Sequence, residues 1–386
     1  TPLGNDGVTP FDGNFDGKGF AVKGYSYKTK EDGEGALFGT IGAEGVVSNL
    51  TSAGEISGGL GGPKGTTKLG HVGGFVGRLY GKLVNVTNTG KVKGIATYNA
   101  GVAGFVQQGA VLDGVKNYGE ITSSAAYVAG VAAYVYEDAE FNKCVNYGNI
   151  SSSVAAGYAA GIAATALPSK FVECVNEGQI SSGSSAGIVA NCSGKSGGLI
   201  YTFDRCQNNG EVTGNGILGG ITAVQGATAG NNVCHYIQCV NNGDITATAT
   251  QAVSSSAMAG IAAFYSPGSV FEYCINTGFV TNTKSVYTAG IAANNKGSAT
   301  ADYPVVFKGC VNTGNIASSA QQIAGIVAYI TNYTSVDSCL NYGTIEQGIW
   351  GAAGICYTMA GTTSSLTNCI NYGDVSVTQY NAGGIV

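Results

Sequence analysis

Charged side chains are scarce in this sequence. Asp, Glu, Lys and Arg make up 11% of its 386 residues, and the formal net charge is only −5. The Lys and Arg residues are scattered, so there is no basic stripe that could neutralise the phosphates of DNA or RNA. We therefore expect no nucleic-acid partner.

Proline and long apolar runs are also scarce. The sequence has 6 Pro against 63 Gly, and no apolar run reaches the roughly 18 residues that a membrane-spanning helix needs. A Gly-rich chain could be a flexible linker, but 44% hydrophobic residues at regular spacing indicate an ordered fold with tight turns. We expect no transmembrane segment in this stretch of chain.

Residue patterns typical of catalytic and metal sites are missing. The two His residues, His71 and His235, do not lie in an H-E-x-x-H motif, and no G-x-S-x-G or C-x-x-C motif occurs. An isolated His in a repeat protein is commonly solvated, and we expect this of both. The sequence therefore predicts no enzymatic activity, no cofactor and no metal site.

One interrupted column of carboxylates bears on an enzymatic alternative. Acidic residues follow a recurrent Gly at Glu55, Glu120, Glu211, Asp244 and Asp374, but Lys91, Asn149, Gln179, Phe279, Asn315 and Thr344 occupy the same place in other repeats. Glycosidases need two acids at a defined separation in a cleft. We interpret the column as a solvated edge, which makes a polysaccharide-degrading enzyme the least favoured function.

The abundant feature of the sequence is a repeat of 29 to 36 residues. CVNYGNISS (Cys144–Ser152) returns as CVNEGQISS from Cys174 and CVNTGNIAS from Cys310, and a second landmark, A-G-I-A-A, occurs at Ala160–Ala164 and Ala289–Ala293. About eleven full units follow one another, and a twelfth begins at Ala382. The repeated positions include Cys144, Cys174, Cys206, Cys239, Cys274, Cys310, Cys339 and Cys369, and Asn146, Asn176, Asn241, Asn312, Asn341 and Asn371.

These units predict short strands rather than helices. Apolar residues come in bursts of three to five between Gly, Asn and Ser, and no helical stripe persists across a unit. A coil that advances one rung per repeat would stack equivalent residues about 4.8 Å apart. We predict an all-β parallel solenoid of about twelve rungs forming a single domain, with residues 1–35 as N-terminal cap and first strands and 36–386 as repeats.

The stacked positions have expected roles. The repeated Asn should form a hydrogen-bonded ladder, and the Gly two residues later should allow a positive φ or a close backbone approach. Buried free thiols are our favoured interpretation of the Cys column, with disulfides between adjacent rungs as the alternative. Thr87 or Val115 should occupy this column in earlier rungs, and the state of Cys192, Cys234 and Cys356, outside the column, stays open.

Tyrosines give the only hint of a binding site. Tyr118 and Tyr147 stand between the repeated Asn and Gly of adjacent units, and so do Tyr342 and Tyr372. Such exposed pairs could stack on sugar rings. They could also stack only on one another as a structural ladder, the interpretation that we favour.

The N-terminal repeats resemble a known family. FDGNFDGKGFAVKGY (Phe11–Tyr25), ALFGTIGAEGVVSNLTSAGEI (Ala36–Ile56) and GGFVGRLYGKLVNVTNTGKV (Gly73–Val92) are similar to the GLUG-type repeats of bacterial surface proteins. These proteins are found especially in Bacteroidota and Firmicutes, and some are described as IgA-protease-like. The later C-x-N-x-G-x-I units depart from that consensus. The resemblance implies a right-handed β-helix and a location on the bacterial cell surface.

Together these observations predict a non-enzymatic extracellular module. It would act as a stalk or adhesin-type scaffold whose loops contact glycans or host surface proteins. The alternative is a dedicated glycan-binding module that uses the tyrosine pairs. The sequence starts without Met and stops within a repeat, so we expect it to be a piece of a longer, processed polypeptide.

Overall fold

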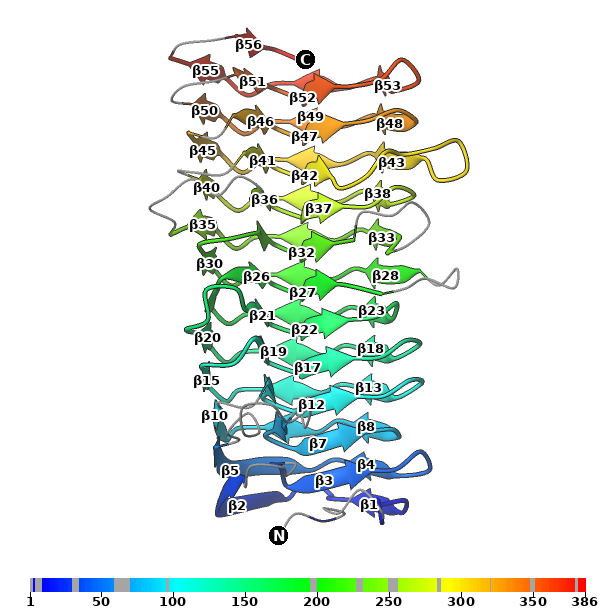
Figure 1. Cartoon of the computed structure of the whole chain (residues 1–386), viewed down its shortest axis with the longest axis vertical. Coiled ribbons are helices and arrows are strands. Elements are labelled where there is room, and N and C mark those ends of the chain that lie inside the picture. Colours follow the sequence, from blue (N-terminus) through cyan, green and yellow to red (C-terminus); the bar gives the residue numbers. More distant parts are fainter. Residues whose placement is uncertain are drawn as a thin grey trace, which may run out of the picture. The chain divides into compact units, whose positions relative to one another are not determined.

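The computed structural model is built from short strands. It describes residue 3 and residues 9–29, 35–58, 70–94, 97–194, 200–226, 232–248, 256–282, 286–319, 321–347, 351–378 and 381–386, and these contain 56 strands and no helix. Contacts divide the chain into two compact units, unit 1 (Thr1–Gly183) and unit 2 (Ser184–Val386). Figure 1 shows unit 1 from blue to green and unit 2 from green to red.

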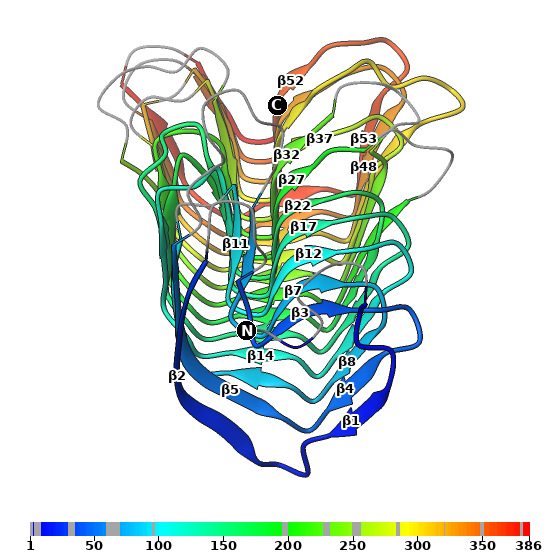
Figure 2. The same cartoon turned by 60° about the horizontal axis from the view of Figure 1, so that its bottom comes forward.

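Each turn of unit 1 contributes strands to four parallel sheets, named A to D here. Sheet A contains β3 (Phe38–Ile41), β7 (Val76–Leu79), β12 (Ala103–Val106), β17 (Ala132–Val135) and β22 (Ala163–Ala166). Sheet B contains β1 (Asn14–Asp16), β4 (Val46–Ser48), β8 (Lys82–Val84), β13 (Val111–Asp113), β18 (Glu140–Asn142) and β23 (Lys170–Val172). In Figure 2, β3, β4 and β5 follow one another around one turn, from sheet A through sheet B to sheet C.

Sheets C and D complete the turns of unit 1. Sheet C contains β2 (Ala21–Thr29), β5 (Thr51–Gly58), β9 (Thr87–Asn88), β10 (Lys91–Gly94), β14 (Lys116–Asn117), β15 (Ile121–Ser123), β19 (Val145–Asn146), β20 (Ile150–Ser152), β24 (Val175–Asn176) and β25 (Ile180–Ser182). Sheet D contains β6 (His71–Gly73), β11 (Tyr98–Ala100), β16 (Tyr127–Ala129) and β21 (Tyr158–Ala160). Strands β1 and β2 pair with β4 and β5, so part of the expected N-terminal cap already belongs to the solenoid sheets.

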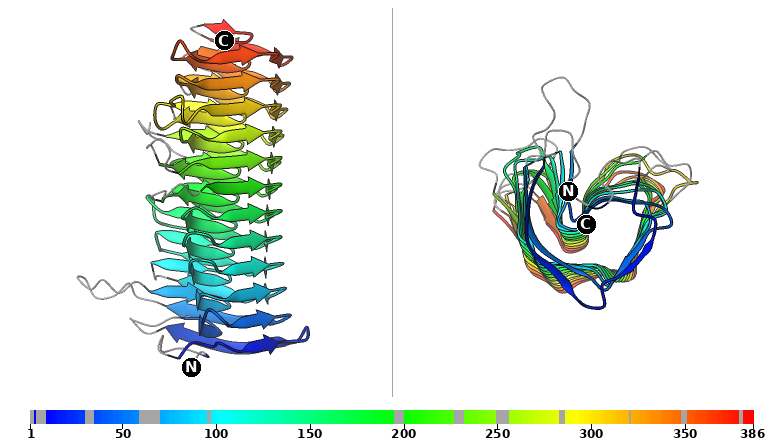
Figure 3. Two further views of the ribbon diagram at one scale, coloured as in Figure 1. Left: turned by 90° about the vertical axis from the view of Figure 1, so that its right-hand side faces the viewer. Right: turned by 90° about the horizontal axis from the view of Figure 1, so that it is seen from below.

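Unit 2 repeats the same four-sheet plan. Sheet A contains β27 (Val189–Cys192), β32 (Thr222–Gln225), β37 (Ala262–Tyr265), β42 (Ala292–Asn295), β47 (Val327–Ile330) and β52 (Cys356–Met359). Sheet B contains β28 (Tyr201–Asp204), β33 (Cys234–Ile237), β38 (Val270–Glu272), β43 (Val305–Lys308), β48 (Thr334–Asp337) and β53 (Ser365–Thr367). The left panel of Figure 3 shows the strands of unit 2, from green to red, stacked one above another.

The remaining strands of unit 2 belong to sheets C and D. Sheet C contains β29 (Gln207–Asn208), β30 (Val212–Gly214), β34 (Val240–Asn241), β35 (Ile245–Ala247), β39 (Ile275–Asn276), β40 (Val280–Asn282), β44 (Val311–Asn312), β45 (Ile316–Ser318), β49 (Leu340–Asn341), β50 (Ile345–Gln347), β54 (Ile370–Asn371) and β55 (Val375–Val377). Sheet D contains β26 (Ser184–Ala186), β31 (Leu218–Gly219), β36 (Ala257–Ala259), β41 (Tyr287–Ala289), β46 (Gln322–Ala324), β51 (Gly351–Ala353) and β56 (Ala382–Gly383).

Strand pairing confirms the predicted fold class. Equivalent residues of successive repeats pair in parallel, as Ile121 does with Ile150 in unit 1 and Val311 with Leu340 in unit 2. The chain is therefore all-β and folds as a right-handed parallel β-helix. Within the described residues, no helix is long and apolar enough to cross a membrane.

The interior is filled by columns of apolar side chains. In unit 1 the rings of Phe141 and Phe171 stack with centroids 4.9 Å apart, and Ile121, Ile150 and Ile180 are fully buried. In unit 2 the buried rings of Phe203, Tyr236, Phe271 and Phe307 stack with centroids 4.5 to 5.1 Å apart. Aromatic pairs of this kind contribute beyond their buried area.

The repeated Asn side chains form a buried ladder in each unit. In unit 2, Nδ2 of Asn241 donates to Oδ1 of Asn276 at 2.8 Å, and Asn276 donates to Asn312 at 2.8 Å. Asn88, Asn117, Asn146 and Asn176 are linked in the same way in unit 1. Each Nδ2 also donates to the carbonyl of the Gly two residues later, as Asn276 does to Gly278 at 3.0 Å. The buried amides are thus satisfied by neighbouring rungs.

The Gly after each Asn is required by close approach. A Cβ at Gly119 would collide with the carbonyl oxygen of Gly90, and one at Gly148 with that of Gly119. Neither Gly has a positive φ. Of the two roles that the sequence suggested for these glycines, the close backbone approach is confirmed and the positive φ is wrong. Glycine is needed here because successive backbones pass without room for a side chain.

One expectation for the Cys column is also wrong. Thr87 pairs with Lys116, which in turn pairs with Val145, so Thr87 stands one place after the column. The residues before them, Val86, Val115 and Cys144, are fully buried. The early rungs therefore fill this column with aliphatic side chains, as the apolar interior requires.

Candidate functional site

The four predicted tyrosines form two exposed stacks, one in each unit. Tyr118 follows β14, and its ring centroid lies 4.5 Å from that of Tyr147 at an interplanar angle of 9°. Tyr342 follows β49 and stacks on Tyr372 at 4.8 Å and 11°. Their exposed fractions are 49%, 42%, 49% and 60% in chain order.

This stacking has a consequence for ligand binding. Nearly parallel rings at such a separation cover the two faces that point toward each other, so a sugar could not stack between them. The backbone N–H of Tyr118 donates to the carbonyl of Asn88, and that of Tyr147 to Asn117, so both rings stand at fixed rung positions. The geometry matches the structural-ladder interpretation, and sugar binding by these four residues stays a prediction.

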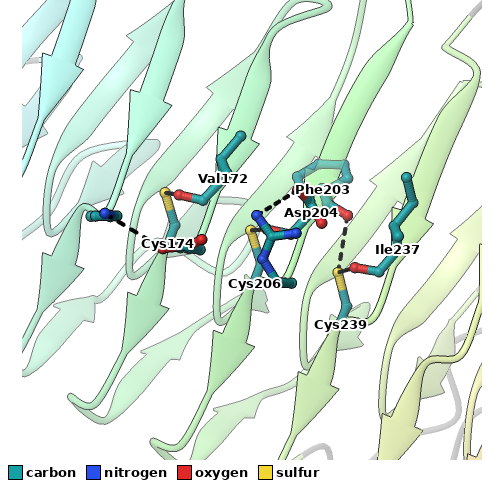
Figure 4. Close-up of polar contacts among 10 residues, drawn as sticks. Val172, Cys174, Phe203, Asp204, Cys206, Ile237 and Cys239 are labelled. Carbon is teal, nitrogen blue, oxygen red and sulfur yellow. Dashed lines mark hydrogen bonds and ion pairs between the residues drawn. The ribbon is translucent and has the colours of Figure 1, made fainter.

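The repeated cysteines are free thiols along sheets B and C. All eleven Cys of the chain are unbridged, and only Cys369 is partly exposed. Cys144 donates from Sγ to the carbonyl of Leu112, and Cys274 to that of Tyr236, both at 3.4 Å. Figure 4 shows Cys239 with the carbonyls of Phe203, at 3.2 Å, and Ile237, at 3.7 Å.

Burial keeps these thiols from contact with solvent, but its effect on their pKa differs along the column. In Cys239 burial, which raises the pKa, is outweighed by hydrogen bonds with the Cys206 and Cys274 thiols, and the pKa is lowered to about 5. In Cys144 and Cys274 burial raises the pKa well above the usual range of a thiol. The thiolate is the nucleophilic form of cysteine, so a raised pKa lowers reactivity. Cys192, Cys234 and Cys356, which lie outside the column, are buried free thiols as well, and burial raises the pKa of Cys356 to about 12.

The acidic column is solvent-exposed and partly structural. Exposed Glu55 and Glu120 form ion pairs with Lys93 at 3.6 Å and with Lys91 at 3.8 Å. Pairs this exposed contribute little to stability. In unit 2, Oδ1 of Asp244 accepts the backbone N–H of Phe279 at 2.8 Å. Asn315 accepts that of Thr344 at 2.9 Å, so these side chains bridge adjacent rungs.

The expectation that both histidines are solvated is wrong. His71 lies on β6 with only 8% of its surface exposed, and burial, followed by the charge of Arg78, lowers its pKa to about 4. Arg78 Nη2 lies 3.4 Å from Nδ1 of His71. His235 lies on β33 and is partly buried, which lowers its pKa. Both belong to regular strands rather than to loops, so their rings are partly removed from water.

His71 is part of an aromatic cluster that the sequence analysis missed. We define the aromatic cluster as seven rings on or beside sheets A and D of unit 1: His71, Tyr98, Phe105, Tyr127, Tyr134, Tyr136 and Tyr158. Along sheet D, Tyr98 and Tyr127 stack at 5.0 Å and Tyr127 and Tyr158 at 5.7 Å. Along sheet A, Phe105 and Tyr134 stack at 4.9 Å.

The two stacks meet edge to face. Tyr98 lies 5.6 Å from Phe105 and 5.3 Å from Tyr134, at angles of 83° and 77°. Tyr98 and Phe105 are 7% and 8% exposed, whereas Tyr136 is 37% exposed and Tyr127 and Tyr134 are partly exposed. Burial, followed by the neighbouring phenols, raises the pKa of Tyr98 to about 12. Tyr98 and Phe105 thus form the buried part of the cluster, and the other tyrosines form its exposed part.

A sequence signal for this cluster exists. Y-x-A-G occurs at Tyr98, Tyr127 and Tyr158, with Tyr three residues before the Gly of the second landmark, and again at Tyr287 in unit 2. Because successive rungs stack in register, this spacing places the three tyrosines of unit 1 in one column. The rings of sheet A also carry a signal, because Phe105, Tyr134, Phe264 and Tyr329 each stand four residues after the Gly of the second landmark.

The search for a metal site and the comparisons with known proteins add no functional site to those described above. Among the described residues, no three His, Cys, Asp or Glu side chains are grouped so that they could hold a metal ion. Comparison of the chain with protein-family models, with curated proteins and with solved structures found no match.

Proposed function

We propose that the chain is a non-enzymatic, extracellular scaffold of the stalk or adhesin type, which presents loops to glycans or host surface proteins. The observation that carries this proposal is the use of the repeated polar residues. Asn side chains donate to the next Asn, Cys thiols donate to backbone carbonyls, and members of the acidic column accept backbone N–H groups. These recurrent contacts stabilise the coil, which leaves contact with partners to the parts of the repeat that vary.

The connections between sheets A and B differ in length from turn to turn. Four residues (107–110) join β12 to β13, and nine residues (296–304) join β42 to β43. The longer loop is ordered, because Tyr303 N–H donates to the carbonyl of Thr300 at 3.1 Å and Ala299 N–H to Oγ1 of Thr331 at 3.2 Å. Tyr303 is 42% exposed at the outside of this loop. An ordered loop with an exposed Tyr is suited to recognition.

A loop exchange tests the proposal. Residues 296–304 would be replaced by Ser266–Gly268 of the neighbouring turn. Tyr265 pairs with Asn295 and Val270 with Val306, so these three residues connect the same two places and keep every strand in register. The parent and the variant would be compared for retention on a printed array of host glycans and on surfaces coated with collagen, fibronectin or mucin. We expect the parent to be retained on at least one surface and the variant to lose that retention at an unchanged melting temperature.

Two results would overturn the proposal. One is a parent chain that none of these surfaces retains. The other is the release of reducing or unsaturated sugars from a panel of polysaccharides, because that would identify an enzyme. The Tyr303→Ala variant distinguishes a specific contact from a general effect of shortening the loop.

A further inference from the structure

We propose that the aromatic cluster of unit 1 is a binding site for a neutral carbohydrate chain that lies along the rungs. This site is separate from the loops considered above and from the tyrosine pairs beside sheet C. Its support comes from internal comparison between the two units, from the chemistry of the exposed groups and from the spacing of the rings.

The fold does not require aromatic residues at these positions. In the column of sheet A that holds Phe105 and Tyr134 in unit 1, unit 2 has Asn191, Val224, Asn294 and Thr358 as well as the rings of Phe264 and Tyr329. In the column of sheet D that holds Tyr98, Tyr127 and Tyr158, unit 2 has Ala257, Gln322 and Gly351 as well as Tyr287. Since small and polar residues satisfy the same backbone geometry, packing alone does not explain seven rings in unit 1.

In unit 2 a lysine covers one of the rings of sheet A. Lys296 places Nζ 4.0 Å from the ring centroid of Phe264, a cation–π contact that occupies the ring face. In unit 1 the equivalent surface instead carries Tyr134 and Tyr127, both partly exposed, with Tyr136 at 37% exposure. These rings are supported from below by Tyr98 and Phe105, so little conformational freedom would be lost on binding.

The exposed chemistry fits a sugar better than a purely apolar ligand. Each tyrosine offers a ring edge with partial positive charge and a hydroxyl that both donates and accepts hydrogen bonds. A pyranose presents C–H groups on its faces and hydroxyls around its rim, and so has a complement for both features. Burial raises the pKa of Tyr134 and Tyr98, so these hydroxyls stay protonated donors at neutral pH.

Charge at the borders of the cluster argues for a neutral ligand. Arg78 lies beside His71, and Glu137 is close enough to Tyr134 to raise its pKa. One cation and one anion at the borders give no field of a single sign, so neither an acidic nor a basic polymer would be favoured. Buried His71 is neutral near pH 7, because its pKa is about 4.

Ring spacing points to a linear chain. Along sheet D the centroids are 5.0 and 5.7 Å apart, and along sheet A they are 4.9 Å apart. A ligand lying along sheet D would meet Tyr127 and Tyr158, which are equivalent and partly exposed on adjacent rungs. Tyr136, inclined at 62° to Tyr134, adds a ring outside the two stacked columns. Repeated, equivalent contacts of this kind suit a polymer of repeating units.

Affinity electrophoresis of the full chain would test the site. The gels would contain soluble glucan, xylan, galactomannan or arabinogalactan as neutral probes, and polygalacturonate as the acidic probe. We expect at least one neutral probe to retard the parent. Tyr136→Ala and Tyr134→Ala should each weaken that binding roughly two- to tenfold. Tyr134→Phe should weaken that binding as well, because it removes the hydroxyl that would hydrogen-bond to the sugar and keeps the ring.

Controls separate binding from folding. Tyr273→Ala removes a tyrosine of unit 2 that is 50% exposed and should leave retardation unchanged. The Tyr134→Phe variant keeps the ring and should melt with the parent, so its loss of binding would not reflect unfolding. Circular dichroism would be recorded for every variant.

Three outcomes would overturn the proposal. They are retardation by no neutral probe, retardation by polygalacturonate alone, and equal retardation of the parent and Tyr136→Ala. Sedimentation would provide a further check. If the parent self-associates and Tyr136→Ala does not, the cluster is an interface between copies of the chain rather than a sugar site. None of these results depends on the outcome of the loop exchange.

Discussion

Gly130 lies directly against the side-chain amide of Asn146, so the two landmarks of the repeat pack on one another. A Cβ at position 130 would collide with Oδ1 of Asn146 and with the carbonyl oxygen of Gly161 in the next turn. The same relationship holds between Gly290 and Asn312 in unit 2. The Gly of the A-G-I-A-A landmark is therefore fixed by the Asn ladder that it covers.

This contact predicts the effect of one added methyl group. Gly130→Ala should lower the free energy of unfolding by about 1–3 kcal/mol, because the Asn ladder and the neighbouring backbone must shift to make room. Gly384→Ala is the matched control, since a Cβ there would meet nothing within 4 Å. Thermal and urea denaturation measure both. Equal stability of the two variants would show that the ladder adapts freely at Gly130.

A break in the ladder should be more costly in its middle than at its end. Asn276→Ala removes the acceptor of Asn241 and the donor to Asn312, and leaves buried polar groups without partners. We expect the free energy of unfolding to fall by about 1–3 kcal/mol. Asn371→Ala removes a partly exposed member that accepts from Asn341, and it should cost less. The reverse order in urea denaturation would contradict the ladder's role.

The ladders could be predicted from sequence because their members recur at one offset in most repeats. Parallel stacking converts such an offset into a column, so the roles of Asn276 and Cys274 follow from position alone. Solvent exposure of His71 could not be predicted in this way. Its burial depends on Phe105, which lies on another strand of the next turn and has no counterpart ring in most repeats. Thr87 lies outside the Cys column because it pairs with Lys116. The sequence did not reveal this pairing, because the early repeats are degenerate.

Thiol accessibility should differ within the Cys column. Cys369 is the only partly exposed Cys, and the hydrogen bond with Cys339, followed by burial, raises its pKa. In native protein a thiol reagent should modify Cys369 slowly, and faster as pH rises because the thiolate reacts. The other ten should react only in denaturant. Mass spectrometry after labelling would identify the sites, and native labelling of Cys274 or an intact Cys310–Cys339 bridge would contradict a buried, unbridged column.

Buried His71 predicts a pH dependence of stability. Its folded-state pKa is about 4, below the ordinary value of 6.5, because burial and then Arg78 disfavour the charged ring. Above pH 6.5 the residue is neutral in both states and has no effect. Between pH 6.5 and about 4 only the unfolded chain binds the proton, so stability falls as pH falls. The loss should approach about 3 kcal/mol at pH 4.

The His71→Phe variant isolates this contribution. It should lose less stability than the parent between pH 6.5 and 4, measured by thermal denaturation at several pH values. His235→Gln is the comparison, because His235 is less buried, and Glu272 opposes the lowering of its pKa by burial. If the parent and His71→Phe lose stability in parallel, the histidine takes up its proton without unfolding.

The architecture of unit 1 predicts that one rung can be removed as a whole. Deleting Val131–Gly161 joins Gly130 to Ile162. Gly130 is equivalent to Gly161, because Ala129 pairs with Ala160, so the new junction has the same register as the old one. Asn117 then stacks on Asn176, and Val115 on Cys174. Stability in a solenoid is roughly a sum of repeat and neighbour terms, so this variant should fold with β-rich circular dichroism and a modestly lower melting temperature. Deleting only Val131–Val145 removes β17 and β18 but keeps β20, which leaves half a rung without its inward face. That variant should be cut by protease at the junction, whereas the whole-rung deletion should resist. Equal unfolding of both variants would mean that contacts between distant repeats, rather than between neighbours, hold unit 1 together.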